Sequence, residues 1–240
     1  MNILALESSA TACSVALWGE AGLIAQSTQN SGLTHSRTLL PMVESLLQNC
    51  EHTLDDVDVI AVAVGPGSFT GLRIGVATAK GLAWAKNKPC AACSTLESMA
   101  WQLAHEKEAV IVCAMDARRK QVYNALFETE QGALRRLCPD CAISLAELGE
   151  ALKNEKKRKI IVGDGAQLCY NSLREQGIEA ELAPDILRMQ SAWGVAKAAL
   201  GHIAHGKLCE SDALIPVYHR LSQAERERLE RLEAQKKMEQ

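Results

Sequence analysis

Hydrophobic and polar residues follow two different periods along this chain, and these periods predict which segments form strands and which form helices. Three apolar runs open the sequence and are predicted strands: residues 2–7, 12–18 and 21–28. In the next segment, 36–48, apolar side chains recur at helical spacing on one face, so we predict an amphipathic helix there. Pro41 fits only the first turn of a helix or a kink, so the regular part is expected to begin near it.

A continuous apolar run, 59–64, leads into a glycine-rich turn and then a second predicted helix, 69–85. This order of elements places backbone N–H groups where a phosphate, or the backbone of a partner, can approach. No Lys-Ser/Thr pair follows Gly71, so the turn is not a P-loop, and its glycine spacing does not fit a dinucleotide fingerprint. The alternative is a tight turn whose glycines serve packing alone.

The second helix carries small residues at helical spacing on one side: Gly71, Gly75 and Ala79. A ridge of this kind allows close contact either with the sheet of its own domain or with a helix of another subunit. Apolar residues surround much of the remaining helix. We therefore expect this helix to be buried within one domain or shared between two chains.

A second set of elements begins near residue 108 and partly repeats the order of the first. Its predicted strands are 109–115, 121–128 and 159–163, and its predicted helices are 144–153, 166–175 and 191–205. This repetition predicts a duplicated, actin-like α/β fold. We place the N-terminal lobe at 1–106, the C-terminal lobe at 107–220 with its end packing back on the first lobe, and a charged tail at 221–240.

Charge and length exclude some functional classes. The formal net charge of −3 argues against strong intrinsic binding to nucleic acid, which requires clustered cations. Met1 runs directly into a strand pattern without a basic leader, and no apolar run approaches the ~20 residues of a membrane helix. We therefore expect a soluble, cytoplasmic protein with no membrane contact.

The nine cysteines are expected to be reduced, and most lie in apolar stretches typical of small core residues, such as Cys13, Cys113 and Cys169. Two Cys-x-x-Cys pairs, 90/93 and 138/141, lie too far apart for a zinc ribbon, and a redox role for the second pair stays a secondary alternative. Two histidines on the last predicted helix, His202 and His205, lack a nearby acidic residue or cysteine and are expected to be solvated. His35 is expected to make a cap or interface contact.

Four segments together resemble one protein family. The glycine-rich turn, Gly65-Pro66-Gly67-Ser68-Phe69-Thr70-Gly71-Leu72-Arg73, is similar to the characteristic motif of the TsaB family. This family supplies the small subunit of the bacterial machinery that makes threonylcarbamoyladenosine on tRNA. The other three segments are Ile3–Ser9, Met115–Tyr123 and Pro216–Arg220, and the likeness covers about residues 1–220. One departure is Glu7, at a position where the family more often has Asp.

The resemblance implies a two-lobed actin/Hsp70-like fold and a non-catalytic role. The chain would pair with TsaD, with TsaE joining the complex, to support threonylcarbamoyl transfer to adenosine 37 of ANN-decoding tRNAs, and would contact tRNA only indirectly. We expect the helices at 36–48 and 69–85 to form a four-helix bundle with the partner, and to form a homodimer when the partner is absent. The predicted interface residues are Leu39, Leu40, Met42, Val43, Leu46, Gly71, Leu72, Ile74, Gly75 and Ala79.

The catalytic chemistry of TsaD is expected to be missing. TsaD carries a His-x-x-x-His metal pair, and the corresponding residues here are Thr95 and Met99, which cannot replace two imidazoles. We predict no catalytic residue, no metal site and no required cofactor. Weak binding of ATP or ADP, or a nucleotide held at the interface of the complex, stays open. The alternative is an enzyme in its own right, either an actin-like ATPase or a metallopeptidase-like hydrolase.

A weak nucleotide site would use loops equivalent to those of the actin-like ATPases. The second phosphate turn is usually glycine-rich in that fold, whereas Asp116-Ala117-Arg118-Arg119 occupies it here. The candidate residues of these vestigial loops are Glu7, Ser8, Ser9, Thr11, Gly65, Gly67, Ser68, Asp116, Arg118, Gly163, Asp164 and Gly165.

Overall fold

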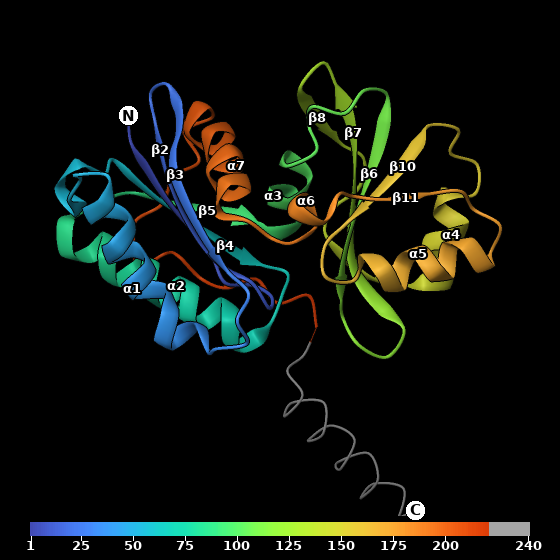
Figure 1. The fold of residues 1–240 in the computed structure, drawn as a ribbon, viewed down its shortest axis with the longest axis horizontal. Helices are drawn as coiled ribbons and strands as arrows, with labels where there is room; N and C mark the ends of the chain where they lie inside the picture. The colour runs from blue at the N-terminus through green and yellow to red at the C-terminus, as the bar shows by residue number, and fades with distance from the viewer. Residues whose placement is uncertain (221–240) are drawn as a thin grey trace, which may run out of the picture.

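The computed structural model describes residues 1–220, which form two lobes built on two separate sheets (Figure 1). The first lobe has a five-stranded sheet in the order β3-β2-β1-β4-β5, in which β1, β4 and β5 are parallel. Its strands are β1 (Ile3–Glu7), β2 (Cys13–Gly19), β3 (Gly22–Gln29), β4 (Val59–Gly65) and β5 (Cys90–Ser94). The predicted charged tail, 221–240, lies outside the described residues.

Helices cover both faces of this first sheet. On the outer face lie α1 (His35–Asn49) and α2 (Phe69–Lys86), with the short 3-10 helix η1 (Leu54–Asp56) between β4 and α1 in the sequence. On the inner face lies α7 (Ala192–Ala204), whose alanines and Val195 pack against β1, β4 and β5. The chain therefore returns from the second lobe to the first.

The second lobe has a six-stranded sheet, in which the path β11-β10-β6-β7-β8 is joined by β9 at the edge of β7. Its strands are β6 (Ala109–Asp116), β7 (Gln121–Glu130), β8 (Ala133–Arg136), β9 (Cys141–Ser144), β10 (Arg158–Val162) and β11 (Glu181–Leu182). Helices α4 (Leu145–Leu152) and α5 (Ala166–Glu175) cover its outer face, and α3 (Thr95–Trp101) covers its inner face. The one-turn helix α6 (Asp185–Arg188) follows β11.

The two sheets have the same topology, which confirms the predicted duplicated fold. Strands β3-β2-β1-β4-β5 correspond in order and direction to β8-β7-β6-β10-β11. Helix α3 follows β5 in the first lobe, and α7 follows β11 and the one-turn α6 in the second. These two helices pack against each other between the sheets (Figure 1). This is the two-lobed actin/Hsp70-like architecture.

The first helix lies within one residue of its predicted bounds, but the expectation that its regular part begins near Pro41 was wrong. Helix α1 begins at His35, and Pro41 lies inside it with its ring exposed to solvent. The elements that were not predicted are short, with at most seven residues each: η1, β5, α3, β8, β9, β11 and α6. Strands of two to four residues contain too few side chains to establish a period.

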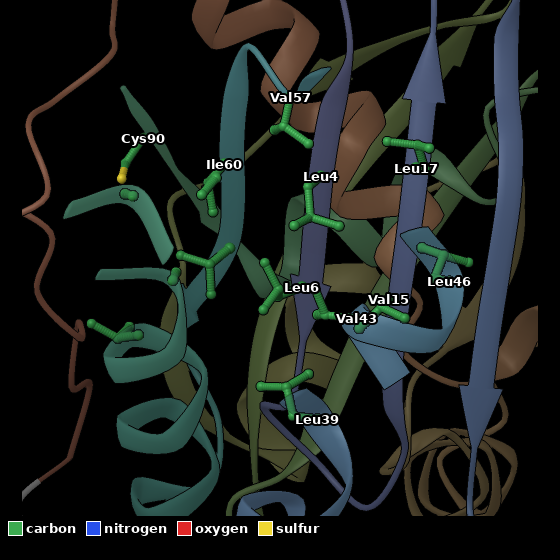
Figure 2. Packing of buried hydrophobic residues seen from close by; sticks show 14 of the residues in the cluster. Leu4, Leu6, Val15, Leu17, Leu39, Val43, Leu46, Val57, Ile60 and Cys90 are labelled. Atoms are coloured by element: carbon green, nitrogen blue, oxygen red, sulfur yellow. The ribbon is translucent and has the colours of Figure 1, made fainter. Parts of the chain in front are cut away.

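Several residues predicted to form a partner interface lie instead in the core of their own lobe. Figure 2 shows Leu39, Val43 and Leu46 of α1 directed toward strands β1 and β2, and all three are buried there. On α2, Leu72 and Ala79 have no exposed surface. The apolar face of each helix is thus used against its own sheet, and these side chains have no surface to offer a partner.

The ridge of small residues on α2 also faces inward, against the turn between β1 and β2. A Cβ built on Gly71 would overlap the carbonyl oxygen of Ser8, and one built on Gly75 would overlap the Ser8 hydroxyl. The Ser8 hydroxyl donates a hydrogen bond of 2.9 Å to the Gly71 carbonyl. The backbone N–H of Ser68 donates to the Ser9 carbonyl at 2.6 Å. The glycines therefore let α2 sit directly on the β1–β2 turn.

Two glycines on α2 provide a matched pair that tests this packing. We expect Gly81→Ala to stabilise the fold by about 0.5–1 kcal/mol, since Gly81 is exposed with open space around it and alanine is the better helix former. We expect Gly71→Ala to destabilise it by roughly 1–3 kcal/mol, because the added methyl overlaps Ser8. Urea unfolding of both variants measures the difference. Equal stabilisation by the two substitutions would contradict the inferred contact.

Candidate functional site

A cleft of about 430 Å³ lies between the two lobes. Four loops line it: the β1–β2 turn, the β4–α2 loop, the β6–β7 turn and the β10–α5 turn. The fifth contributor is the segment at the end of the described chain, which we call the closing segment and define as residues 214–220. Because the two sheets are duplicates, the four loops meet as two equivalent pairs at the same edge.

The structure brings the predicted vestigial loops together at this cleft. Those that line it are Ser9, Thr11, Gly67, Ser68, Asp116, Arg118 and Asp164. The others are buried beneath or beside them: Glu7, Ser8, Gly65, Gly163 and Gly165. Two of these glycines allow close approaches, since a Cβ on Gly163 or Gly165 would collide with the backbone of β6 near Ala114.

Glu7, at the end of β1, is a fully buried carboxyl group. Its Oε1 accepts a hydrogen bond of 2.6 Å from the Ser9 N–H, whereas its Oε2 has no partner. The pKa of Glu7 is raised from its ordinary 4.5 to about 7, mainly by burial, and the nearby Asp164 carboxylate contributes to this rise. With a pKa of about 7, this carboxyl group is close to half protonated at neutral pH.

Asp164 faces Glu7 from the second lobe, at the turn between β10 and α5. Its Oδ1 accepts a hydrogen bond of 2.9 Å from the amide of Gln190. Burial raises the pKa of the Asp164 carboxyl, and the nearby Asp116 also acts to raise it. Three carboxyl groups therefore approach this cleft, and two of them have a reduced tendency to ionise.

The β6–β7 turn has a conformation that its residues do not favour. Arg118, Arg119 and Lys120 are three successive non-glycine residues with positive φ, at 64°, 55° and 59°. The Arg118 N–H donates to Asp116 Oδ1 at 2.7 Å, which holds the turn from within. At this position long cationic side chains replace the compact glycines that would let a phosphate approach the backbone.

For the closing segment, the sequence predicts a family motif at Pro216–Arg220 and an end that packs back on the first lobe, but not the contacts that it makes. In the structure the Val217 N–H donates to the Val64 carbonyl at 2.7 Å, and the Tyr218 ring stacks on Phe69 with centroids 4.5 Å apart. The Arg220 guanidinium donates to the Ala117 carbonyl in the other lobe. Contacts between residues so distant in sequence leave no periodic signal, so the motif itself was the only indication.

The two residues predicted to stand in place of a metal-binding histidine pair lie on α3. Thr95 and Met99 have no exposed surface and pack between the lobes. Within residues 1–220, no three His, Cys, Asp or Glu side chains are grouped so that they could hold a metal ion. Likewise, no helix in this part of the chain is both long and apolar enough to cross a membrane.

The remaining candidate residues occupy structural positions. Cys13, Cys113 and Cys169 are buried, as predicted for core residues. Cys138 accepts a hydrogen bond from the Leu126 N–H, and burial raises the pKa of Cys141, which disfavours a reactive thiolate. His35 donates from Nε2 to the Ala10 carbonyl at 2.6 Å, so it ties the start of α1 to the β1–β2 turn.

Comparison with known proteins identifies the family. A family model described as TsaD, tRNA N6-adenosine threonylcarbamoyltransferase, matches residues 25–227. The protein named tRNA threonylcarbamoyladenosine biosynthesis protein TsaB from Bacillus subtilis (strain 168) is 35% identical over 232 residues, which cover 94% of this chain and 96% of that protein. The chain belongs to the TsaB family.

Two further comparisons agree with this assignment. The TsaB protein of Escherichia coli (strain K12) is 31% identical over 222 residues, or 92% of this chain and 95% of that protein. The structure of YeaZ from Pseudomonas aeruginosa aligns with a TM-score of 0.79 at 31% identity, covering 90% of this chain and 99% of that chain. The four sequence motifs therefore identified the family correctly, and the chain spans nearly the whole length of these relatives.

The buried Glu7 makes a prediction about stability and pH. Its raised pKa means that the folded state favours the protonated carboxyl, so this stabilisation is complete below about pH 4.5 and is lost as pH rises to about 7. The raised pKa of Asp164 acts in the same direction. The free energy of unfolding of the wild type should therefore fall as pH rises from about 4.5 to about 7. We expect Glu7→Gln to make this fall smaller by on the order of 3 kcal/mol.

Urea unfolding of the wild type and Glu7→Gln at pH 5 and pH 8 tests this. The variant is expected to lose less stability than the wild type between the two pH values. If the free energy of unfolding changes by the same amount in both proteins between pH 5 and pH 8, Glu7 does not titrate in this range and its pKa is not raised.

Proposed function

We propose that this chain is a non-catalytic subunit that binds a TsaD-type transferase and supports formation of N6-threonylcarbamoyladenosine at position 37 of ANN-decoding tRNAs. TsaE joins the same complex, and tRNA is contacted mainly through the partner. We further propose a cytoplasmic location and a homodimer when the partner is absent. Membership of the TsaB family supports the assignment to this pathway.

The observation that carries the binding role is the uncovered outer surface of α2. Trp84 is 81% exposed, and it follows exposed Ala77 and Gly81 at helical spacing along the same helix. On the neighbouring α1, Leu40 is 42% exposed. Small residues beside a large aromatic ring favour close packing of another helix, and an apolar surface of this kind is costly to leave in water.

The proposed interface therefore lies on this outer surface, and most of the interface residues expected from periodicity are not part of it. Of that set, Leu40 is exposed, while Met42 and Ile74 are partly exposed. The four-helix arrangement with the partner therefore stays a proposal, but it now rests on the outward side of α1 and α2. Leu72→Glu would test folding rather than association, since Leu72 is buried.

The non-catalytic role is supported by the chemistry of α3 and of the cleft. At the position of the TsaD metal pair the chain has a buried hydroxyl and a buried thioether, Thr95 and Met99. The β6–β7 turn offers arginines instead of glycines, and the cleft contains carboxyl groups. We propose that no cofactor is required by this chain, and that any ATP or ADP is bound weakly or at the interface of the complex.

Substitutions on the outer surface test the binding role. We expect Leu40→Glu and Trp84→Glu to weaken association with TsaD by roughly 30-fold or more, because a buried aromatic anchor commonly contributes about 2 kcal/mol or more. Threonylcarbamoyl transfer by the reconstituted complex should fall in parallel. Size-exclusion chromatography with the partner and a transfer assay measure both effects.

Ile186→Glu is the matched control, since Ile186 is 89% exposed but lies on α6, away from α1 and α2. It should leave association and transfer unchanged. Unfolding curves must show that all three variants remain folded. Normal association by Leu40→Glu and Trp84→Glu would refute this surface as the binding site.

A further inference from the structure

The closing segment occupies the cleft between the lobes, and nothing in the proposed function accounts for it. Its residues Val217, Tyr218, His219 and Arg220 form part of the lining of the cleft, opposite Ser9 and Asp116. A segment without regular secondary structure is ordered only where specific contacts fix it. Three residues of this segment, Val217, Tyr218 and Arg220, make specific contacts.

The first set of contacts fixes the segment to the first lobe. The backbones of Cys90 and Cys209 exchange two hydrogen bonds of 2.8 and 2.9 Å, which aligns the approach to the segment with β5. Leu214 is buried in the core under α2. The Val217 N–H then binds the Val64 carbonyl at the end of β4.

Gly65 shows how closely this backbone approaches. A Cβ built on Gly65 would overlap the Val217 carbonyl oxygen, so any other residue at this position would push the segment away. Gly65 is part of the glycine-rich turn by which the family was recognised. One reason for a glycine there is therefore contact with the closing segment, in addition to its backbone conformation at a φ of 138°.

A second set of contacts attaches the segment to the first turn of α2. The Tyr218 ring stacks on Phe69, and the Arg73 guanidinium lies 3.8 Å from the centroid of the Phe69 ring. Arg73 Nε also donates to the Tyr218 hydroxyl at 3.1 Å. Three side chains thus form one stack over the start of α2.

The last contact reaches the other lobe. The Arg220 guanidinium donates to the carbonyl of Ala117, which belongs to the strained β6–β7 turn. Within about four residues, the segment therefore passes from the end of β4 in the first lobe to the β6–β7 turn in the second.

We propose that residues 216–220 are an intramolecular latch that holds the two lobes together across the mouth of the cleft. The stack on Phe69 is its anchor in the first lobe, and Arg220 is its contact in the second. Displacement of the latch would open the cleft and free the first turn of α2 at the same time. This inference does not rest on the proposed partner or pathway.

Hydrogen exchange measured by mass spectrometry on the full chain tests the latch. The two peptides of interest cover 64–72 in the first lobe and 115–121 in the second. We expect Arg220→Ala to raise exchange in 115–121 by about tenfold, which corresponds to the loss of one hydrogen bond to a charged group. Arg220→Lys, which keeps a donor, should restore part of the protection.

The decisive variant is Tyr218→Ala, because the Tyr218 contacts described above are confined to the first lobe. A latch requires that this change also raise exchange in 115–121, across the cleft. The matched control is Ile215→Ser, since Ile215 lies on the same segment but is 64% exposed and absent from the cleft lining. It should leave both peptides unchanged.

Two outcomes would overturn the proposal. One is normal exchange in 115–121 for both Arg220→Ala and Tyr218→Ala. The other is a rise in exchange that each variant causes only in the lobe that its own side chain contacts. The segment would then pack on each lobe without coupling them. Unfolding curves for every variant exclude global destabilisation as the cause.

Discussion

The close contact between α2 and the β1–β2 turn is the constraint on which the rest of this structure depends. Gly71 and Gly75 let the helix approach Ser8 so closely that the serine hydroxyl binds helix backbone. That contact sets the position of α2 over the sheet and joins the β4–α2 loop to the β1–β2 turn. One wall of the cleft and one face of the lobe are therefore fixed by the same pair of glycines.

The interlobe cleft is formed by loops from both of the duplicated sheets. Its loops meet as the duplicated topology requires, yet a buried Glu7, a turn of cations and the closing segment stand where a phosphate site would need compact backbone donors. The sheets position these loops, so the cleft forms whatever chemistry its side chains provide. The outer surface of α2 is then the more prominent feature of the molecule.

Much of the fold could be predicted from sequence because its main elements are long enough to show a period. The helices at 36–48 and 69–85 and the first three strands were found within one or two residues. The short strand β11 and the helix α6 were not predicted, since two to four residues carry no period. The repeated order of elements after residue 108 also predicted a second sheet like the first.

The candidate site was harder to predict, for a physical reason. Helical periodicity shows that Leu39 and Leu72 share an apolar face with their neighbours, but it does not show whether that face meets its own sheet or another chain. The structure settles this in favour of the sheet. The contacts of Tyr218 and Arg220 join residues more than a hundred positions apart in the sequence, and no local pattern encodes such a contact.

The central claim is that this chain acts by binding a transferase partner through the outer surface of α1 and α2. The most direct test is the light-scattering mass of the wild-type chain alone and mixed with TsaD from the same source. The account predicts a homodimer that converts to a heterodimer when TsaD is added. A chain whose mass is unchanged by TsaD, with or without nucleotide, would contradict it.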